Sequence, residues 1–339
     1  MPTPKTKVVV VGGGTGTYTL LRGLRPYHEE LDIAAIVTMA DSGGSTGRLR
    51  DEFGQLPVGD VRQALAALAT DVSGANNLLR DLFLYRFKSG EGLSGHNFGN
   101  LFLTALIDIL GSESEAIAAA SELLRIRGRV IPVTTDHVDL QARYLSGRVI
   151  VGEHAIDESD GDNIYDRIVE LTLTPNAQIA REAKEAIIAA EYIIFGPGDF
   201  YTSILANVVV DGFSASVAQS NATTIFVANL MARPGQTIGM QLSDYVAEFV
   251  HYLNKPPDIV LVPDAPLSVV LTTHYKTVDG VHPVSYELQS NEVTLCRAAI
   301  VNNEIITAQP GDALSRSLIR HDSNALGQAI IELLHSQAN

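Results

Sequence analysis

The chain has a single cysteine among its 339 residues and far fewer basic than acidic side chains. The lone Cys296 excludes an internal disulfide, and its apolar surroundings from Val293 to Val301 predict a core position rather than a nucleophile. With 24 Lys and Arg against 39 Asp and Glu, the formal net charge is −15. Such a charge disfavours non-specific binding of nucleic acid, so we expect no nucleic-acid partner. An anionic ligand would have to be bound by local groups, such as the backbone N–H groups at helix N-termini.

Long apolar runs are missing as well. No run approaches about 18 residues, so no membrane span is expected. The first apolar strand pattern begins close to the start of the chain, which leaves no room for a signal peptide. Together with the single cysteine, these features predict a cytoplasmic protein. A hydrophobic fraction of 46% suits a globular core, and the lack of linkers and internal repeats predicts one α/β domain over residues 1–339.

The first feature that is present is a glycine-rich turn between a strand and a helix. The run Val8–Val11 is typical of a strand buried on both faces, and Leu20, Leu21 and Leu24 follow at helical spacing. Glycines let the backbone approach a ligand, and the unpaired N–H groups at a helix start favour an anion, so we expect a phosphate here. A purely structural turn is the alternative. The turn residues are Gly12, Gly13, Gly14, Thr15 and Gly16.

The same turn argues against two common nucleotide sites. The dinucleotide fingerprint G-x-G-x-x-G, started at Gly12, fails at its last position, which is Thr17. No lysine follows at the spacing of a P-loop. We therefore expect phosphate or nucleotide binding without NAD.

A second glycine-rich loop follows the next expected strand, Ile33–Met39. Asp41 would lie at the carboxyl end of a parallel strand, where ligands gather. It could bind a ribose hydroxyl or, together with a phosphate, hold Mg²⁺. The alternative is an Asx-turn with Arg48 and Arg50 in solvent. The candidate binding residues of this loop are Asp41, Ser42, Gly43, Gly44 and Ser45.

Three further groups of polar residues are candidates for the same site. Asp60 precedes a helix and either caps it or closes over a ligand. His96, Asn97 and Asn100 gather at a helix start between glycines, which favours ligand contact over a structural role. A third turn between strand and helix contributes Gly196, Gly198, Asp199 and Ser203.

The remaining pattern predicts the architecture. Strands that alternate with helices indicate an α/β fold with a Rossmann-like, mostly parallel sheet flanked by helices. Residues 138–175 alternate apolar and polar side chains instead, so we expect a small β-rich insertion with a hairpin. Its His154 and the acidic loop Asp157–Asp162 lack the spacing of a calcium loop and are expected at the surface. Short strands are expected over Pro283–Leu288 and Val293–Val301.

Taken together, the loops resemble those of the YvcK/CofD-like family. The match extends in order from about residue 8 to about residue 300, and the combination is far more specific than any single loop. The matching stretches are VGGGTG from Val11, DSGGSTGRLR from Asp41, PVGDVR from Pro57, GHNFGN from Gly95, GPGDFYTS from Gly196 and NLMARPGQT from Asn229. The GRLR and GHNFGN segments are closer to the YvcK branch than to the transferase branch.

The resemblance implies a ligand across the strand ends and a homodimer. For the YvcK branch it implies binding of UDP-sugars and a role in central carbon metabolism, as a gluconeogenesis factor, and in cell-wall or cell-shape control. For the CofD branch it implies Mg²⁺-dependent transfer of a phospholactyl group from a guanosine diphosphate donor to a deazaflavin. It also assigns the loops Gly12–Gly16 and Asp41–Ser45 to the nucleotide or phosphate site, and His96, Asn97 and Asn100 to its wall.

One departure from the family bears on the choice between these functions. Many members carry two adjacent acids where this chain has Asp41-Ser42. The missing carboxylate weakens the Mg²⁺ and transferase interpretation, because hard cations want several oxygen ligands. Since no general base stands out either, a nucleotide-sugar-binding factor is the leading hypothesis and the transferase is the second. An oxidoreductase comes third because of Thr17.

Overall fold

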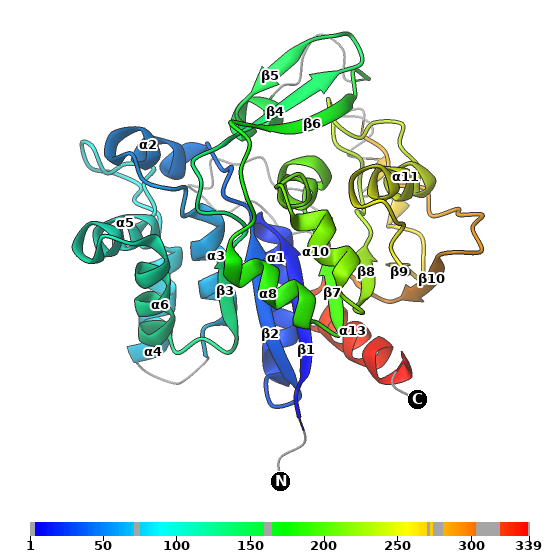
Figure 1. Cartoon of the computed structure of the whole chain (residues 1–339), viewed down its shortest axis with the longest axis horizontal. Coiled ribbons are helices and arrows are strands. Elements are labelled where there is room, and N and C mark those ends of the chain that lie inside the picture. The colour runs from blue at the N-terminus through cyan, green and yellow to red at the C-terminus, as the bar shows by residue number, and fades with distance from the viewer. Residues whose placement is uncertain are drawn as a thin grey trace.

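The computed structural model describes residues 4–70, 75–158, 165–269, 272–273, 281–302 and 319–337. In this part of the chain a seven-stranded sheet has the order β10-β9-β8-β7-β1-β2-β3, and every neighbouring pair is parallel. The strands are β1 (Thr6–Gly12), β2 (Leu31–Val37), β3 (Arg129–Pro132), β7 (Tyr192–Phe195), β8 (Thr223–Val227), β9 (Ile259–Pro263) and β10 (Thr294–Ala298). Helices flank the sheet (Figure 1), which confirms the predicted Rossmann-like α/β fold.

The first strand of the chain, β1, contributes side chains to both cores of the protein. In β1, Val8 and Val10 pack into one core and Val9 and Val11 into the other, which explains the unbroken run of valines. The first core is covered by α1 (Gly14–Leu24), α3 (Gly59–Leu68), α4 (Ala75–Leu84), α5 (Phe98–Leu110), α6 (Glu113–Leu124) and α13 (Ser323–Gln337). The second is covered by the insertion and by α8 (Arg181–Ala189), α10 (Phe213–Gln219) and α11 (Leu242–Leu253). Within the described ranges, no helix is both long and apolar enough to cross a membrane.

The strand order places a topological switch at β1. This strand stands between β2 and β7, so the chain continues on opposite sides of it. In open parallel sheets, ligands bind outside the carboxyl ends of the strands at such a point. The segments that follow β1, β2 and β7 are the three predicted glycine turns. They lead into α1, which ends in the 3₁₀ turn η1 (Arg25–Tyr27), into α2 (Gly44–Phe53), and into the π-helical turn η2 (Phe200–Leu205) with α9 (Ala206–Val208).

Residues 138–175 form the predicted β-rich insertion. β4 (Asp139–Tyr144) pairs antiparallel with both β5 (Val149–Val151) and β6 (Ile168–Thr174) in a three-stranded sheet. Figure 1 shows this sheet beyond the carboxyl ends of the main strands. A short helix that the sequence pattern did not indicate, α7 (Glu153–Asp157), follows β5. The insertion therefore lies on the side of the molecule where a ligand is expected.

The two strands expected near the C-terminus have different outcomes. The prediction of a strand over Pro283–Leu288 is wrong, because the backbone of this segment bonds to the loop after β8 and not to a neighbouring strand. Pro283 forms an isolated bridge with Met231, and Val284 N–H donates to the Leu230 carbonyl at 3.2 Å. The run Val293–Val301 does contain β10, at the edge of the main sheet. The run ends in β11 (Val301–Asn302), which pairs antiparallel with β12 (Arg320–His321).

Helix α1 is held at its C-terminal end by a close contact with α13. A Cβ on Gly23 would lie 2.0 Å from the Ser323 carbonyl oxygen, and one on Gly327 would lie 2.2 Å from the Gly23 carbonyl oxygen. The Ser323 hydroxyl also donates to the Thr19 carbonyl at 2.8 Å. Backbone meets backbone here, so neither glycine accepts a side chain unless a helix moves.

We expect Gly327→Ala to lower the free energy of unfolding by about 1–3 kcal/mol, the usual range for overpacking a tight contact. The loss should appear although alanine is the better helix former. Urea denaturation followed by circular dichroism measures it, with Gln328→Ala at the exposed neighbouring position as the control. If Gly327→Ala is no less stable than the control, the two helices do not depend on this contact.

Candidate functional site

The predicted site residues gather at the carboxyl edge of the sheet, in the segments after β1, β2 and β7. We call this region, together with the segment after β8 and helix α7, the edge site. A Cβ on Gly16 would lie 2.2 Å from the Pro197 carbonyl oxygen, and one on Gly13 would lie 2.3 Å from Oδ2 of Asp60. The β1 turn therefore touches both the β7 turn and the start of α3. At Gly16 the close atoms are backbone, so only glycine fits there.

Two helices begin at the edge site with a glycine as the N-cap residue. The N-cap residue of α1 is Gly13 and that of α2 is Gly43, and neither helix start has a side-chain cap. The N–H groups of the two helix starts therefore take their partners from outside the N-cap residue, and the positive ends of the helix dipoles favour negative charge there. Phosphate or nucleotide binding at the two loops stays a prediction.

Carboxylates of the protein bond to amides of the same turns. Gly14 N–H donates to Oδ1 of Asp60 at 2.8 Å. Gly43 N–H donates to Oδ1 of Asp41 at 2.9 Å, which is the Asx-turn considered as an alternative. An ionised carboxylate has about four acceptor positions, so one amide bond leaves room for ligand hydroxyls. Asp60 thus holds the β1 turn from the start of α3.

The carboxylates of the edge site are close enough to raise one another's pKa. Burial and the neighbouring Asp41 raise the pKa of Asp60 to about 7. Burial also raises the pKa of Asp41 itself. Burial and the charges of Asp41 and Asp157 raise the pKa of Glu153 well above its ordinary value, and burial together with Asp199 raises that of Asp157. The ligand-free edge site is therefore an unfavourable place for so many negative charges.

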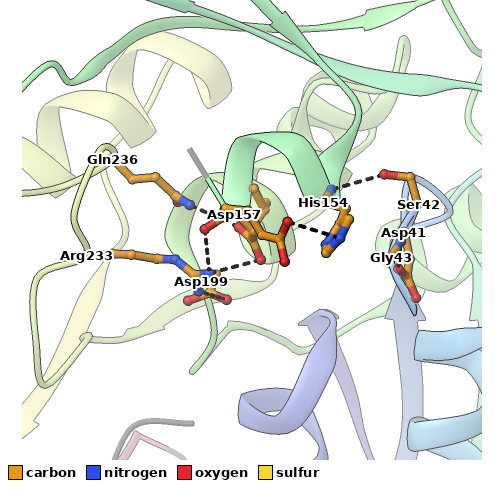
Figure 2. Close-up of polar contacts among 10 residues, drawn as sticks. Asp41, Ser42, Gly43, His154, Asp157, Asp199, Arg233 and Gln236 are labelled. Carbon is orange, nitrogen blue, oxygen red and sulfur yellow. Dashed lines mark hydrogen bonds and ion pairs between the residues drawn. The ribbon is translucent and has the colours of Figure 1, made fainter. Parts of the chain in front are cut away.

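Helix α7 joins the two sides of the edge site (Figure 2). At its start, His154 N–H donates to Ser42 Oγ at 3.0 Å, and Ser42 N–H donates in return to the carboxylate of Glu153. At its end, Asp157 pairs with Arg233 at 3.1 Å and accepts a bond from Gln236 Nε2 at 2.9 Å. The insertion is thereby tied to the segment after β2 and to the segment after β8.

The prediction that Asp157 lies at the surface is wrong. Its side chain is only 19% exposed, because α7 folds back over the edge of the main sheet. The side chain of His154, at 44% exposed, does lie near the surface as expected. Glu153 was missed, although its spacing of four residues from Asp157 puts both acids on one face of a helix. Residues 159–162 of the acidic loop lie outside the described residues.

The β7 turn lies against the β1 turn. The side-chain amide of Asn207 donates to the Gly12 carbonyl at 3.1 Å and to the Ser203 carbonyl at 2.7 Å. The side-chain amide of Asn229 donates to the Gly198 carbonyl at 2.7 Å. This turn continues into η2, and π-helical turns are frequent at functional sites. The structure thus brings the third predicted group to the edge site: Gly196, Gly198, Asp199 and Ser203.

The polar cluster at the start of α5 faces α2. The side chain of Asn97 caps α5 by accepting a backbone N–H at 2.8 Å. His96 Nδ1 lies 3.2 Å from Ser45 Oγ, and Asn100 Nδ2 donates to Thr46 Oγ1 at 3.1 Å. All three predicted side chains are buried. They lie next to the Asp41 loop with partners inside the protein, and direct ligand contact by them stays a prediction.

The two arginines that follow the second glycine-rich loop have partners away from the edge site. Arg50 donates to Asp139 at 2.7 Å, and Arg48 donates to the Ser94 carbonyl at 3.3 Å. Among the described residues, Arg233 places its guanidinium at the edge site, where it pairs with both Asp157 and Asp199, and the buried Arg62 lies close behind. Arg233 belongs to the matching stretch NLMARPGQT, but its ion pairs could not be predicted, because Asp157 and Asp199 come from two other segments.

The carboxylates do not form a metal cage by themselves. Among the residues that the structure describes, no three His, Cys, Asp or Glu side chains are arranged to hold one ion together. Mg²⁺ bound at Asp41 stays a prediction, and it would depend on oxygen ligands from a phosphate.

Fold and site together define an α/β protein whose parallel sheet carries uncapped helix starts and acidic side chains at its carboxyl edge. The family model described as 2-phospho-L-lactate transferase CofD matches residues 8–303. The chain therefore belongs to the CofD family. The matched range includes all the loops that form the edge site.

Relatives in several bacteria share nearly the whole chain. A putative gluconeogenesis factor of Thermotoga maritima is 40% identical, with 96% of this chain and 98% of the relative covered. The gluconeogenesis factor of Bacillus subtilis is 35% identical, with 97% and 98% covered. An X-ray crystal structure of a Bacillus halodurans protein has a TM-score of 0.85 at 34% identity, covering 97% of this chain and 100% of that one. The solved structure agrees with the fold described above.

The raised pKa of Asp60 predicts how its substitution changes stability with pH. A carboxyl group whose folded-state pKa lies above its ordinary value stabilises the folded protein at low pH, and this stabilisation is lost as the pH rises through the folded-state pKa. Relative to the unaltered protein, we therefore expect Asp60→Asn to gain stability between about pH 4 and about pH 7. Urea unfolding at a series of pH values measures the difference.

The difference between the two proteins is needed because other groups titrate in the same range. Burial lowers the pKa of His321 to about 4, which removes stability in both proteins as the pH falls. Asp81→Asn, at an exposed position of α4, is the matched control. A stability difference for Asp60→Asn that stays constant from about pH 4 to about pH 7 would contradict the raised pKa.

Proposed function

We propose that the chain is a cytoplasmic nucleotide-sugar-binding factor of the YvcK type, with UDP-sugars as its ligand class. In this role it supports gluconeogenic carbon metabolism and the regulation of cell wall and cell shape, and it acts as a homodimer. The relatives that bear the name gluconeogenesis factor support the metabolic part. The observation that carries the proposal is the mixed chemistry of the edge site, where two uncapped helix starts lie beside carboxylates.

The diphosphate and the hydroxyls of a nucleotide sugar have matching groups at the edge site. The amides at the starts of α1 and α2 favour the diphosphate. Asp41 and Asp60 keep acceptor positions for the ribose and sugar hydroxyls. A third phosphate would bring more negative charge toward these acids and be repelled. A diphosphate that carries a sugar therefore suits the edge site better than a nucleoside triphosphate.

The second candidate function is that of the CofD branch. There the protein would use Mg²⁺ to move a phospholactyl group from a guanosine diphosphate donor to a deazaflavin, and the name of the matching family favours this reading. Ser42, in place of a second acid, and the lack of a metal cage among the described residues favour the first candidate. Mg²⁺-dependent release of GMP would distinguish the transferase.

Calorimetric titration with UDP-N-acetylglucosamine, with and without Mg²⁺, tests the proposal. We expect saturable binding that does not depend on Mg²⁺ and that exceeds the binding of UTP, GTP, GDP and NAD. Tight Mg²⁺-dependent binding of a guanosine nucleotide, without any response to the UDP-sugar, would contradict the proposal and favour the transferase.

Asp41→Asn is the matched variant for this titration. Losing a charged acceptor should weaken UDP-N-acetylglucosamine binding about tenfold or more. Binding of pyrophosphate, which carries no sugar hydroxyls, should not weaken. Circular dichroism checks that the variant is folded. If the variant binds both ligands like the unaltered protein, Asp41 is only a turn residue.

A further inference from the structure

Arg62 is a buried cation behind the edge site, and the proposed function gives it no role. The residue is 8% exposed. Its Nε donates to Oδ1 of Asn100 at 2.8 Å, and its Nη1 donates to the Phe83 carbonyl at 3.4 Å. A buried guanidinium is costly unless its donors find acceptors. We therefore expect the Arg62 guanidinium, buried so close to the edge site, to have a role there.

A chain of hydrogen bonds leads from Arg62 to Asp41. Asn100, which accepts from Arg62, donates through Nδ2 to Thr46 Oγ1 at 3.1 Å. Thr46 Oγ1 lies beside the carboxylate of Asp41, since a Cβ on Gly59 would lie close to both, and its hydroxyl opposes the burial that raises the Asp41 pKa, as a hydrogen-bond donor does. Asn100 is 2% exposed and Thr46 is 5% exposed, so water does not compete for these bonds. We call this chain the Arg62 relay.

The first bond of the relay determines the direction of all the others. A guanidinium has only donors, so Asn100 must turn Oδ1 toward Arg62 and Nδ2 toward Thr46. Thr46 Oγ1 accepts from that amide, and its single proton remains for Asp41. The bonds therefore run one way, and the Asp41 carboxylate stands at the accepting end.

Two glycines leave room for the relay. A Cβ on Gly59 would lie 2.2 Å from Oδ2 of Asp41 and 2.5 Å from Oγ1 of Thr46, and one on Gly99 would lie 2.8 Å from Cδ of Arg62. In the stretch PVGDVR, Gly59 leaves space for the relay and Arg62 supplies its guanidinium. In the stretch GHNFGN, Gly99 leaves space and Asn100 supplies the side-chain amide that links Arg62 to Thr46. The relay therefore explains why these two stretches carry these residue types.

We propose that Arg62 is a positioning residue of the edge site: through Asn100 and Thr46, it orients the Asp41 carboxylate toward the hydroxyls of the nucleotide sugar. This inference rests on the proposed function, in which Asp41 accepts those hydroxyls. Asn100 then acts from behind the site, as a link in the relay and not as a ligand contact.

Thr46 offers a matched pair of variants. Thr46→Val removes the relaying hydroxyl with little change in shape, whereas Thr46→Ser keeps it. By titration calorimetry we expect Thr46→Val to bind UDP-N-acetylglucosamine about tenfold more weakly. Thr46→Ser should bind it like the unaltered protein, and neither variant should change pyrophosphate binding. If Thr46 only packs α2, Thr46→Val will change the binding of both ligands or of neither. Such a result would overturn the proposal.

A double variant tests whether the relay acts through Asp41. Thr46→Val should add nothing to the loss caused by Asp41→Asn, because the end of the relay is then already changed. If the losses of affinity in the two single variants add up in the double variant, the proposal is overturned. The proposed binding of UDP-sugars is not contradicted by that result. Arg62→Met should weaken binding as Thr46→Val does. It should also lower Tm, because Oδ1 of Asn100 then stays buried without its donor.

Hydrogen exchange at the Gly43 amide gives a readout without ligand. This amide donates to Asp41 at 2.9 Å, and a carboxylate that is free to turn releases it more often. We expect faster exchange in Thr46→Val than in Thr46→Ser. If the unaltered protein does not bind UDP-N-acetylglucosamine, the proposed function fails and the exchange result alone decides the relay. Equal exchange in the two variants would overturn it.

Discussion

The structure depends on contacts between bare backbone at the two ends of α1. At the N-terminal end, Gly16 lies against the Pro197 carbonyl, and at the C-terminal end Gly23 lies against Ser323 and Gly327. A side chain at any of these glycines would force the helix away from its neighbours. Because the helix is held at both ends, its uncapped start stays at the carboxyl edge of the sheet. The position of the edge site follows from this packing.

At that edge the protein sets carboxylates against backbone amides. Asp60 and Asp41 bond to amides of the glycine turns, and α7 adds Glu153 and Asp157 from the insertion. Burial raises the pKa of each of these groups, and like charges add to the rise for Asp60, Glu153 and Asp157, so the edge site stores unfavourable electrostatics. Hydroxyl donors from a sugar would satisfy the acids, and a diphosphate would satisfy the helix starts. Proteins tolerate unfavourable local interactions of this kind at functional sites and avoid them in the rest of the fold.

Much of this could be predicted from the sequence, because local patterns determined it. The valine run, the glycine turns and the helical spacing indicated a parallel sheet with its site at the strand ends, and the structure confirms that fold. Partners distant in sequence were not predictable. Asp157 appeared to belong to a surface loop because α7 has only five residues, and its contacts come from segments after β7 and β8. Similarly, the polar residues at the expected helix start indicated a site near Asn97 and Asn100 but not that Arg62 lies behind it.

The most direct test of the central claim is to map the ligand by backbone amide NMR. On addition of UDP-N-acetylglucosamine, the account predicts the largest shift changes at Gly14–Gly16 and Gly43–Ser45, with smaller ones in α7. A cavity of about 350 Å³ at the opposite ends of the strands, lined in part by Lys7, Asp32 and Arg129, provides the contrast. Shift changes confined to that cavity, with the glycine turns unaffected, would contradict the assignment of the edge site.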